Sequence, residues 1–165
     1  MRRSLVATTV TAVLVLAPPA AAGLPRAGTL VPGRSLGGIR LGESAQAVRA
    51  ALGGFHGNCR NCAQPTWYFT YRPFDQHGLA VEFTRGRVSG VYTLWQPAGW
   101  HAQRGLRLGA PVLAVHRLAG ASRTASCRGY EALVSDSAHA RNAYYLYRGR
   151  LWGFGLFPRG SSPCR

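Results

Sequence analysis

A thirteen-residue motif occurs twice in the chain, and this internal repeat limits the folds that the sequence can adopt. The first copy, at 41–53, begins with Leu-Gly, has Val six residues after that Gly, and ends with Gly eleven residues after it. The second copy, at 108–120, keeps all of these spacings. A long internal period predicts that one structural unit occurs twice. Because the shared residues are Gly, Leu and Val, the motif predicts scaffold rather than a catalytic site.

A second matched pair of segments supports the repeat. Phe83–Gly90 and Leu146–Gly153 each contain Arg-Gly-Arg between two runs of strand-forming residues. The central Gly readily takes a positive φ, so each Arg-Gly-Arg predicts a tight β-hairpin. The first pair of motifs is offset by 67 residues and the second pair by 63, and their order along the chain is the same.

Each repeat is predicted to contain a helix followed by a three-stranded antiparallel meander. Apolar residues at helical spacing place the helices at about 44–52 and 111–119, and Ser44 and Pro111 suit their first turns. Strand-like runs follow at 67–71, 79–84, 88–94, 130–134, 143–147 and 151–157. A small sheet with one apolar face is marginal alone, so we expect an α+β fold in which two tandem repeats share one antiparallel sheet. Both helices would pack on one face of that sheet.

The N-terminal segment predicts export. Arg2 and Arg3 precede an apolar stretch from Ser4 to Leu16, and residues 20–22 offer a small-residue cleavage site. That stretch is too short for a membrane span, and no later stretch is long enough, so we expect a secreted or envelope-associated monomer without a span. The predicted segments are a signal peptide at 1–22, a flexible tether at 23–35, repeat one at 36–95, a linker at 96–105 and repeat two at 106–165, with both repeats in one compact domain.

The charge balance favours anionic partners. The chain has a net charge of +15, and every basic residue is arginine. Without the predicted signal peptide, eighteen arginines and five acids remain, a net charge of about +13. An acidic wall polymer or the acidic face of a protein would be attracted to such a surface, whereas the scattered arginines and the predicted export argue against a specific nucleic acid. A GC-rich genome, which encodes Arg in place of Lys at solvated surface positions, would explain the same excess of arginine. Both interpretations stay open.

Four cysteines in a small exported protein predict two disulfides. We expect Cys59–Cys62 and Cys127–Cys164, because the first two lie in one short loop. The loop-entropy model gives about 2 kcal/mol for the short loop and about 4 kcal/mol for the long one. The Cys59–Cys62 spacing also matches a redox dithiol, but such motifs begin a helix, and this one leads into a predicted strand. One such motif is half a zinc signature, so no metal and no cofactor is expected.

The order of short strand, Leu-Gly, helix, Gly and meander, all duplicated, resembles the β-lactamase inhibitor protein, which is secreted and has a disulfide in each half. It also resembles the related small lipoproteins of the outer-membrane assembly machinery. The matching residues are Leu41, Gly42, Val48 and Gly53, with Leu108, Gly109, Val115 and Gly120. The family pattern has a hydrophobic residue and then Thr or Ser after the Gly; Ser44 fits, and Glu43, Ala110 and Pro111 depart from it. In that inhibitor an acidic residue on a hairpin loop contacts the enzyme, and the resemblance makes the loop residue Asp75 the candidate for this role.

No catalytic constellation is expected, and binding is the favoured activity. Trp95 and Trp100 flank the predicted linker, where a groove or a partner interface would form. The hairpin arginines are candidate anion contacts: Arg85, Arg87, Arg148 and Arg150. Trp67 and Trp152 are expected in the sheet core. The sequence therefore predicts a secreted, non-catalytic binding protein whose partner is an unknown protein or an anionic cell-wall polymer. The alternatives are an inhibitor of a secreted hydrolase such as a β-lactamase, and thiol–disulfide exchange at Cys59 and Cys62.

Overall fold

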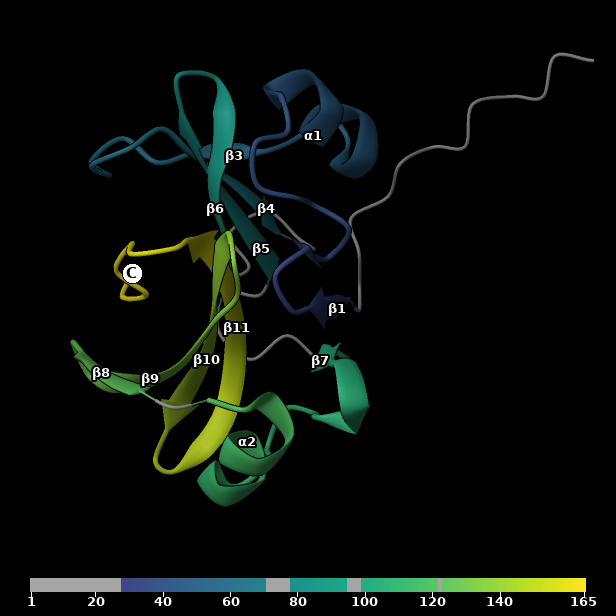
Figure 1. Cartoon of the computed structure of the whole chain (residues 1–165). Coiled ribbons are helices and arrows are strands. Elements are labelled where there is room, and N and C mark those ends of the chain that lie inside the picture. Colours follow the sequence, from purple (N-terminus) through teal and green to yellow (C-terminus); the bar gives the residue numbers. More distant parts are fainter. Residues whose placement is uncertain (1–27, 71–77, 95–98, 122) are drawn as a thin grey trace, which may run out of the picture.

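The computed structural model describes residues 28–70, 78–94, 99–121 and 123–165. These residues form two α-helices, an eight-stranded sheet and a three-stranded sheet (Figure 1). The helices are α1 (Ala45–Leu52) and α2 (Val112–Ala119), and Gln103–Gly105 forms the short 3-10 helix η1. In spatial order, the large sheet contains β3 (Gly57–Asn58), β4 (Thr66–Thr70), β5 (Gly78–Thr84), β6 (Arg87–Leu94), β11 (Arg150–Pro158), β10 (Ala140–Tyr147), β9 (Tyr130–Asp136) and β8 (Arg123–Cys127). The small sheet contains β2 (Ser35–Leu36), β1 (Thr29–Val31) and β7 (His101–Ala102).

The α+β class and the antiparallel large sheet are as expected from the sequence. All neighbours in the large sheet are antiparallel, and β6 and β11 join at its centre through the pairs Tyr92–Gly155 and Val91–Leu156. The outermost strands β3 and β8 were not expected. Both are short and carry few buried side chains, so they lack the apolar alternation that reveals a half-buried strand.

Each helix is short and is stabilised by packing rather than by its own length. The Ser44 side chain accepts a hydrogen bond from the Ala47 amide of α1, and the Gly53 amide donates to the Arg49 carbonyl at the other end. Val48 and Leu52 form the buried stripe of α1, and Val115 takes the corresponding place in α2. Both helices pack on the same face of the large sheet, as predicted.

The hairpins on either side of the sheet centre have the same backbone geometry. Arg85 and Gly86 have φ of 51° and 72°, and Arg148 and Gly149 have φ of 50° and 73°. Positive φ at both central residues is the two-residue turn whose twist matches that of the flanking strands, and Gly takes the second position without strain. The predicted hairpins are therefore confirmed. Each is followed by the same close contact: the Gly42 amide donates to the Val88 carbonyl over 2.8 Å, and the Gly109 amide donates to the Leu151 carbonyl over 2.7 Å.

Parts of the predicted tether and of the predicted linker form short strands. From Thr29 onward the N-terminal segment forms β1, which pairs in parallel with β7 from the expected linker. Leu30 and Ala102 are both buried. Two eight-residue helices cannot cover an eight-stranded sheet, and the small sheet covers the gap between them (Figure 1). Both segments are rich in Gly and Pro, a composition that predicts loops. The single large apolar residues within them, which complete the core, were therefore not expected to be buried.

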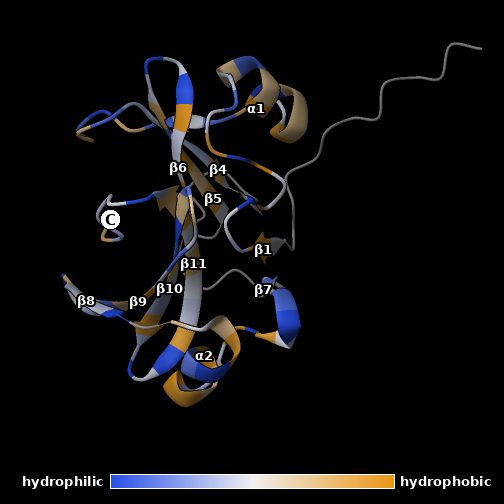
Figure 2. Ribbon diagram, viewed as in Figure 1, coloured by the Kyte–Doolittle hydropathy of each residue, from blue (hydrophilic) through white to orange (hydrophobic). Residues whose placement is uncertain are grey.

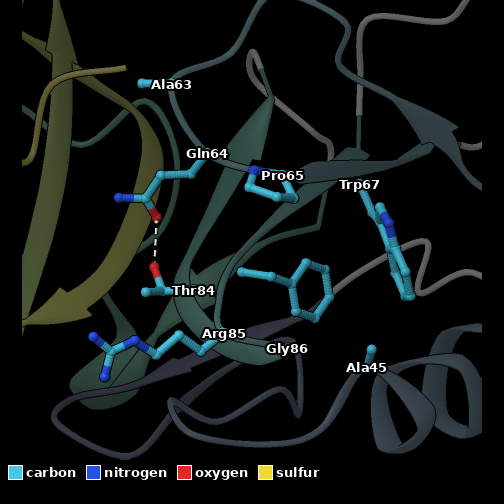
Figure 3. A pocket seen from close by; sticks show the side chains of 9 residues that line it. Ala45, Ala63, Gln64, Pro65, Trp67, Thr84, Arg85 and Gly86 are labelled. Atoms are coloured by element: carbon cyan, nitrogen blue, oxygen red, sulfur yellow. Dashed lines mark hydrogen bonds between the residues drawn. The ribbon is translucent and has the colours of Figure 1, made fainter.

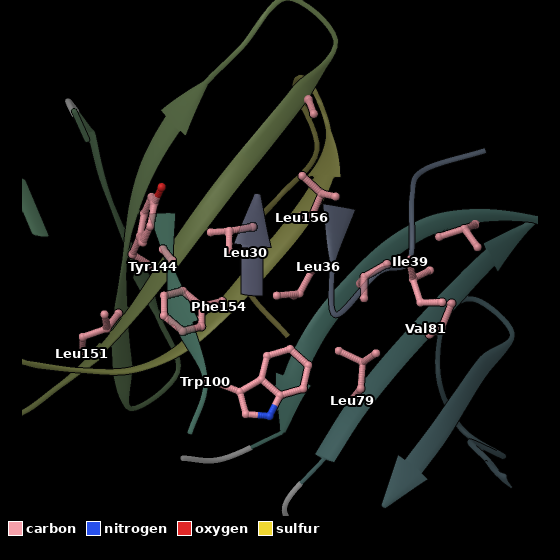
Figure 4. Close-up of a cluster of buried hydrophobic side chains, with 14 of the residues drawn as sticks. Leu30, Leu36, Ile39, Leu79, Val81, Trp100, Tyr144, Leu151, Phe154 and Leu156 are labelled. Atoms are coloured by element: carbon pink, nitrogen blue, oxygen red, sulfur yellow. The ribbon is translucent and has the colours of Figure 1, made fainter. Parts of the chain in front are cut away.

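The main core lies between the large sheet and the layer that contains the helices and the small sheet. Figure 4 shows the part of this core beneath the small sheet, where Leu30 and Leu36 lie close to Phe154 and the ring of Trp100. In the part of the chain that the structure describes, no helix is long and apolar enough to cross a membrane.

Candidate functional site

The face of the large sheet opposite the helices, called here the open face, carries a second cluster of aromatic side chains. Its buried aromatic members are Tyr92, Tyr145 and Phe157, and Tyr68, Tyr130 and Trp152 pack half-buried around them. The residues after β11, 159–165, lie on this side of the sheet (Figure 1). This segment is called here the C-terminal segment.

The strand register explains why the open face is hollowed. Two tyrosines and three small residues form one row across the sheet: Tyr68, Ala80, Tyr92, Gly155 and Ala143 are successive partners. Residues that are directly opposite each other on neighbouring strands point to the same face of a sheet. These side chains therefore all belong to the open face. The small residues form a floor between aromatic walls.

Two adjoining hollows result. One has a volume of about 770 Å³ and lies between the loop after Cys62, the strands β4 to β6, and the C-terminal segment. The other, of about 220 Å³, lies farther across the sheet beneath Tyr130, Tyr145 and Trp152. Tyr68, Tyr92 and Arg165 line both hollows. Together they give the open face a recess that can accept side chains or a small ligand.

The expected disulfides are confirmed, and they lie on opposite sides of this recess. Cys59 is bonded to Cys62, and the Tyr68 hydroxyl donates to the Cys62 Sγ at 3.4 Å. Cys127, at the end of β8, is bonded to Cys164 of the C-terminal segment. The second disulfide therefore fixes the C-terminal segment against the open face.

Hydrogen bonds to the backbone hold the C-terminal segment in place. The Tyr145 hydroxyl donates to the Pro163 carbonyl over 2.9 Å. The Tyr130 hydroxyl donates to the Arg165 backbone oxygen and accepts from the Arg165 amide. Arg141 donates from one guanidinium nitrogen to the Ser161 carbonyl and pairs through the others with Asp136. Burial raises the pKa of Tyr145 well above the usual tyrosine range, so this hydroxyl stays a neutral donor.

One ion pair lies at the floor of the larger hollow. Glu82 is only 7% exposed, and both of its carboxylate oxygens face the Arg165 guanidinium, at 2.5 Å and 2.9 Å from Nε and Nη2. The same guanidinium lies over the ring of Phe157, 4.3 Å from its centroid, and 5.9 Å from that of Tyr92. Burial, together with the charge of Tyr68 and Glu82 nearby, raises the pKa of the Tyr92 hydroxyl. The site therefore combines a buried carboxylate with aromatic faces.

Trp100 does not form part of an exposed binding site. Its side chain is 1% exposed and packs in the main core, so the expectation of a surface groove beside it is wrong. A Cβ on Gly28 would lie 2.8 Å from the Trp100 ring, which shows how closely the backbone passes over it. The other two predicted contacts, Trp95 and Asp75, lie outside the described residues.

The hairpin arginines do not converge on one anion site. Because β6 and β11 are antiparallel, the β5–β6 and β10–β11 hairpins project from opposite ends of the sheet, where Figure 2 shows hydrophilic stretches. Arg87 donates to the Gly42 carbonyl over 3.4 Å, and Arg150 donates to the Gly109 carbonyl over 3.0 Å. These two side chains thus tie each hairpin to the loop before a helix. Arg148 instead covers the Tyr147 ring, 5.2 Å from its centroid.

A separate apolar hollow lies between α1 and the β5–β6 hairpin (Figure 3). Its volume is about 460 Å³, and Pro65, Trp67 and Phe83 supply most of its apolar lining, with Arg85 on its margin. The Gln64 Oε1 accepts hydrogen bonds from Thr84 and from Ser89, which fixes the loop above it. Trp67 packs against the main core as expected, and its ring is stacked on His56 at 4.0 Å between centroids.

The Cys59–Cys62 loop lacks the setting of a redox dithiol. It lies between β3 and β4, so no helix begins at either cysteine to lower a thiol pKa. Residues 33–37 match G-x-S-x-G, the pattern around the nucleophilic serine of α/β-hydrolases, where a strand leads directly into a helix. Here Ser35 belongs to a two-residue strand that is not followed directly by a helix. Among the described residues, no group of three or more His, Cys, Asp or Glu side chains could hold a metal ion.

The residues that make up the open-face site were not identified from the sequence. The sequence places Tyr68 and Tyr92 in predicted strands with nothing to distinguish them from other strand residues. The alternation around Glu82 predicts a side chain that faces solvent. Arg165 follows Cys164, and no motif in the surrounding sequence points to a binding site. The pairing of β4, β5 and β6 places the first three residues on one face. Arg165 reaches them because the C-terminal segment folds back over the sheet, so no local pattern could have revealed the site.

The fold defines an α+β protein with helices on one face of a mostly antiparallel sheet. No protein-family model matches the chain, and no curated protein matches it. Among solved structures, a DUF4309 family protein (YjgB) of Bacillus subtilis has 16% identity and a TM-score of 0.50, over 71% of this chain and 79% of the other. An extracellular protein with an SCP domain from Bacillus anthracis has 10% identity and a TM-score of 0.49, over 72% of this chain. This chain spans only 44% of the length of that protein. The likeness to the Bacillus subtilis protein concerns the fold alone.

Proposed function

We propose that this protein is an exported, non-catalytic binding protein that holds another exported protein on the open face of its large sheet. The recess between Tyr68, Tyr130 and Trp152 carries the proposal. These side chains are half-buried, and each presents an apolar ring that a partner can cover together with a polar group at its edge. Tyrosine and tryptophan are enriched in protein interfaces for this reason.

Charge supports an acidic partner. The chain carries twenty arginines and five acids, and the open face contributes one buried acid that is already paired. A partner with an acidic face would therefore be attracted over long range, and the attraction would weaken as salt is added. The aromatic recess would supply the short-range contacts that make binding specific.

The halves on either side of the sheet centre are proposed to be copies of one helix-plus-meander unit. The hairpins, the Gly42 and Gly109 contacts, and the irregular pairing that follows Glu82 and Tyr145 support this proposal. These irregularities lie 63 residues apart, which is the offset of the Arg-Gly-Arg motifs. The resemblance to the β-lactamase inhibitor protein makes an exported hydrolase one partner to test, with Asp75 as its predicted contact.

The test is capture of a partner by the immobilised protein from the secreted and surface fractions of its own organism. A partner retained by the wild-type protein should be lost by Tyr68→Ala/Trp152→Ala and kept by Tyr147→Ala, which removes an exposed tyrosine outside the recess. Binding is then measured with the purified partner, and a β-lactamase is included as a candidate. Equal binding by all three proteins would remove the open face as the site.

A second candidate function is attachment to an anionic envelope polymer. Arg34, Arg40 and His139 line one hollow of about 260 Å³ where the β1–β2 turn meets the β9–β10 turn. None of the described residues that line this hollow is acidic, so its arginines would favour a phosphate or carboxylate group. Arg34→Ala/Arg40→Ala should release the protein from isolated cell wall at lower salt than Arg117→Ala/Arg128→Ala, which removes the same charge elsewhere. Identical release would assign the binding to net charge alone.

A further inference from the structure

The Glu82 carboxylate lies in a cage that is built around a planar cation. Two oxygens face the guanidinium of Arg165, and the ring of Phe157 lies 4.3 Å from it on another side. The Glu82 side chain is 9% exposed and that of Arg165 is 23% exposed. Burial of a carboxylate costs free energy unless a positive charge pairs with it. The Glu82 carboxylate therefore requires a cation beside it.

The backbone beside the cage makes room for this acid. A Cβ added to Gly90, the β6 partner of Glu82, would lie 2.6 Å from the Glu82 Oε2 and 3.0 Å from the Phe157 ring. Any larger residue at position 90 would therefore displace the carboxylate or the ring. The cage thus consists of groups from three strands and is preformed by the sheet, whereas its occupant comes from the C-terminal segment.

The occupant is held less firmly than the cage. The backbone of Arg165 is fixed by Tyr130 and by the neighbouring Cys164 disulfide, but its side chain reaches the cage from outside the sheet. Among the described residues, the other hydrogen-bond acceptors of the guanidinium are carbonyls of its own segment, at Ser162 and Cys164. Rotation of this side chain would open the Glu82 cage to the 770 Å³ hollow without unfolding any strand.

We infer that the Glu82 cage is a binding site for a guanidinium group, and that Arg165 occupies it as a tethered internal ligand. A guanidinium is the ligand that fits, because its flat fork pairs with both carboxylate oxygens while its face lies on an aromatic ring. An ammonium group can neutralise Glu82 but cannot make the paired contact. The inference concerns the cage alone and holds whether or not the open face binds a protein.

A tethered occupant keeps free ligand out. Its effective concentration is in the millimolar range or above, so a weak external guanidinium cannot compete with it. Replacement of Arg165 by Ala leaves Glu82 buried and unpaired, and the cage should then accept L-argininamide with a dissociation constant on the order of 1 mM, the strength expected for so small a ligand. Because the tethered Arg165 side chain competes for the cage at this effective concentration, the wild-type protein should bind L-argininamide at least about twofold more weakly.

The experiment is a titration of Arg165→Ala with L-argininamide, followed by amide NMR shifts at Gly90 and Tyr92. Citrullinamide, in which a neutral urea replaces the guanidinium, is the matched control ligand and should not bind. Lysinamide should bind several-fold more weakly than L-argininamide. The double variant Glu82→Gln/Arg165→Ala removes the carboxylate and should lose binding while it keeps a neutral, unstrained cage.

Stability provides an independent measurement. If Glu82 is left unpaired in Arg165→Ala, L-argininamide should raise the unfolding midpoint of this variant and leave that of the double variant unchanged, because a ligand stabilises only the state that binds it. Arg165→Gln, which keeps a hydrogen-bond donor, replaces Arg165→Ala if the latter does not fold. Equal binding of L-argininamide and citrullinamide, or binding that survives the loss of Glu82, would overturn the inference. So would a folded Arg165→Ala protein that binds neither ligand.

Discussion

The two faces of the large sheet are both aromatic, but they are covered in different ways. One face packs against helices and the small sheet, and its side chains, such as Phe69 and Phe154, are almost fully buried. The open face is covered only in part by the C-terminal segment, and it leaves Tyr68, Tyr130 and Trp152 half-buried around a recess. Burial on the first face stabilises the fold, whereas incomplete burial on the second leaves apolar surface for a partner.

The largest effect should come from a change on the helix-covered face. Trp100→Ala removes a fully buried ring from the main core and should lower the free energy of unfolding by about 3–5 kcal/mol. Tyr147→Ala, at a residue that is 50% exposed, should cost less than about 1 kcal/mol. Urea denaturation of both variants measures the difference. A small loss for Trp100→Ala would mean that this ring is not part of the core.

On the open face, the disulfides should contribute unequally. Replacement of Cys127 and Cys164 by Ser opens the longer loop and should cost about 4 kcal/mol, and the same change at Cys59 and Cys62 about 2 kcal/mol. Only the first change also frees the C-terminal segment. Hydrogen exchange at residues 159–165 should therefore rise in the first variant and stay slow in the second. Equal exchange in both would show that the hydrogen bonds alone hold this segment.

Loss of one tyrosine hydroxyl should have a smaller effect on the same face. Tyr130→Phe keeps the ring but removes both hydrogen bonds to the Arg165 backbone, and the expected cost is about 1–2 kcal/mol. Tyr68→Phe removes the hydroxyl that donates to the Cys62 sulfur over 3.4 Å and should cost less than about 1 kcal/mol. Thermal unfolding of the two variants separates these cases, and a greater loss for Tyr68→Phe would contradict the assignment.

The smallest expected effect is a pH dependence at the margin of the open face. The hydrogen bond from Arg141 holds the pKa of the Asp136 carboxyl below its usual range. A carboxyl with a lowered pKa in the folded state stabilises the protein above the pKa of the unfolded chain, and this contribution is lost as the pH falls through the folded value. Asp136→Asn should therefore lower the free energy of unfolding by less than about 1 kcal/mol at pH 7. In strong acid, where Asp136 is protonated in both states, it should have no effect. Urea denaturation of the wild-type protein and of Asp136→Asn at pH 7 and in strong acid measures this difference, and an equal loss under both conditions would contradict the prediction.

The sequence predicted the helix-covered face far better than the open face. The Leu-Gly motifs and the Arg-Gly-Arg hairpins are local patterns, and the helices and hairpins formed within a residue or two of the expected bounds. The small sheet escaped prediction because β1 and β7 bring together residues 72 positions apart, and each strand has only one buried apolar side chain. The Glu82–Arg165 pair spans 83 positions. Its members meet only because the Cys127–Cys164 disulfide and the Tyr130 hydroxyl hold the C-terminal segment against the sheet.

The central position of β11 has a consequence for how the chain folds during synthesis. This strand lies between β6 and β10, yet it follows every other strand of the large sheet along the chain. Until it is made, the first half of the sheet ends at β6, whose inner edge offers unpaired amide and carbonyl groups to any other extended chain. The nascent protein therefore passes through a stage that is prone to self-association. A chaperone that shields this edge would raise the yield more than one that acts on the finished chain.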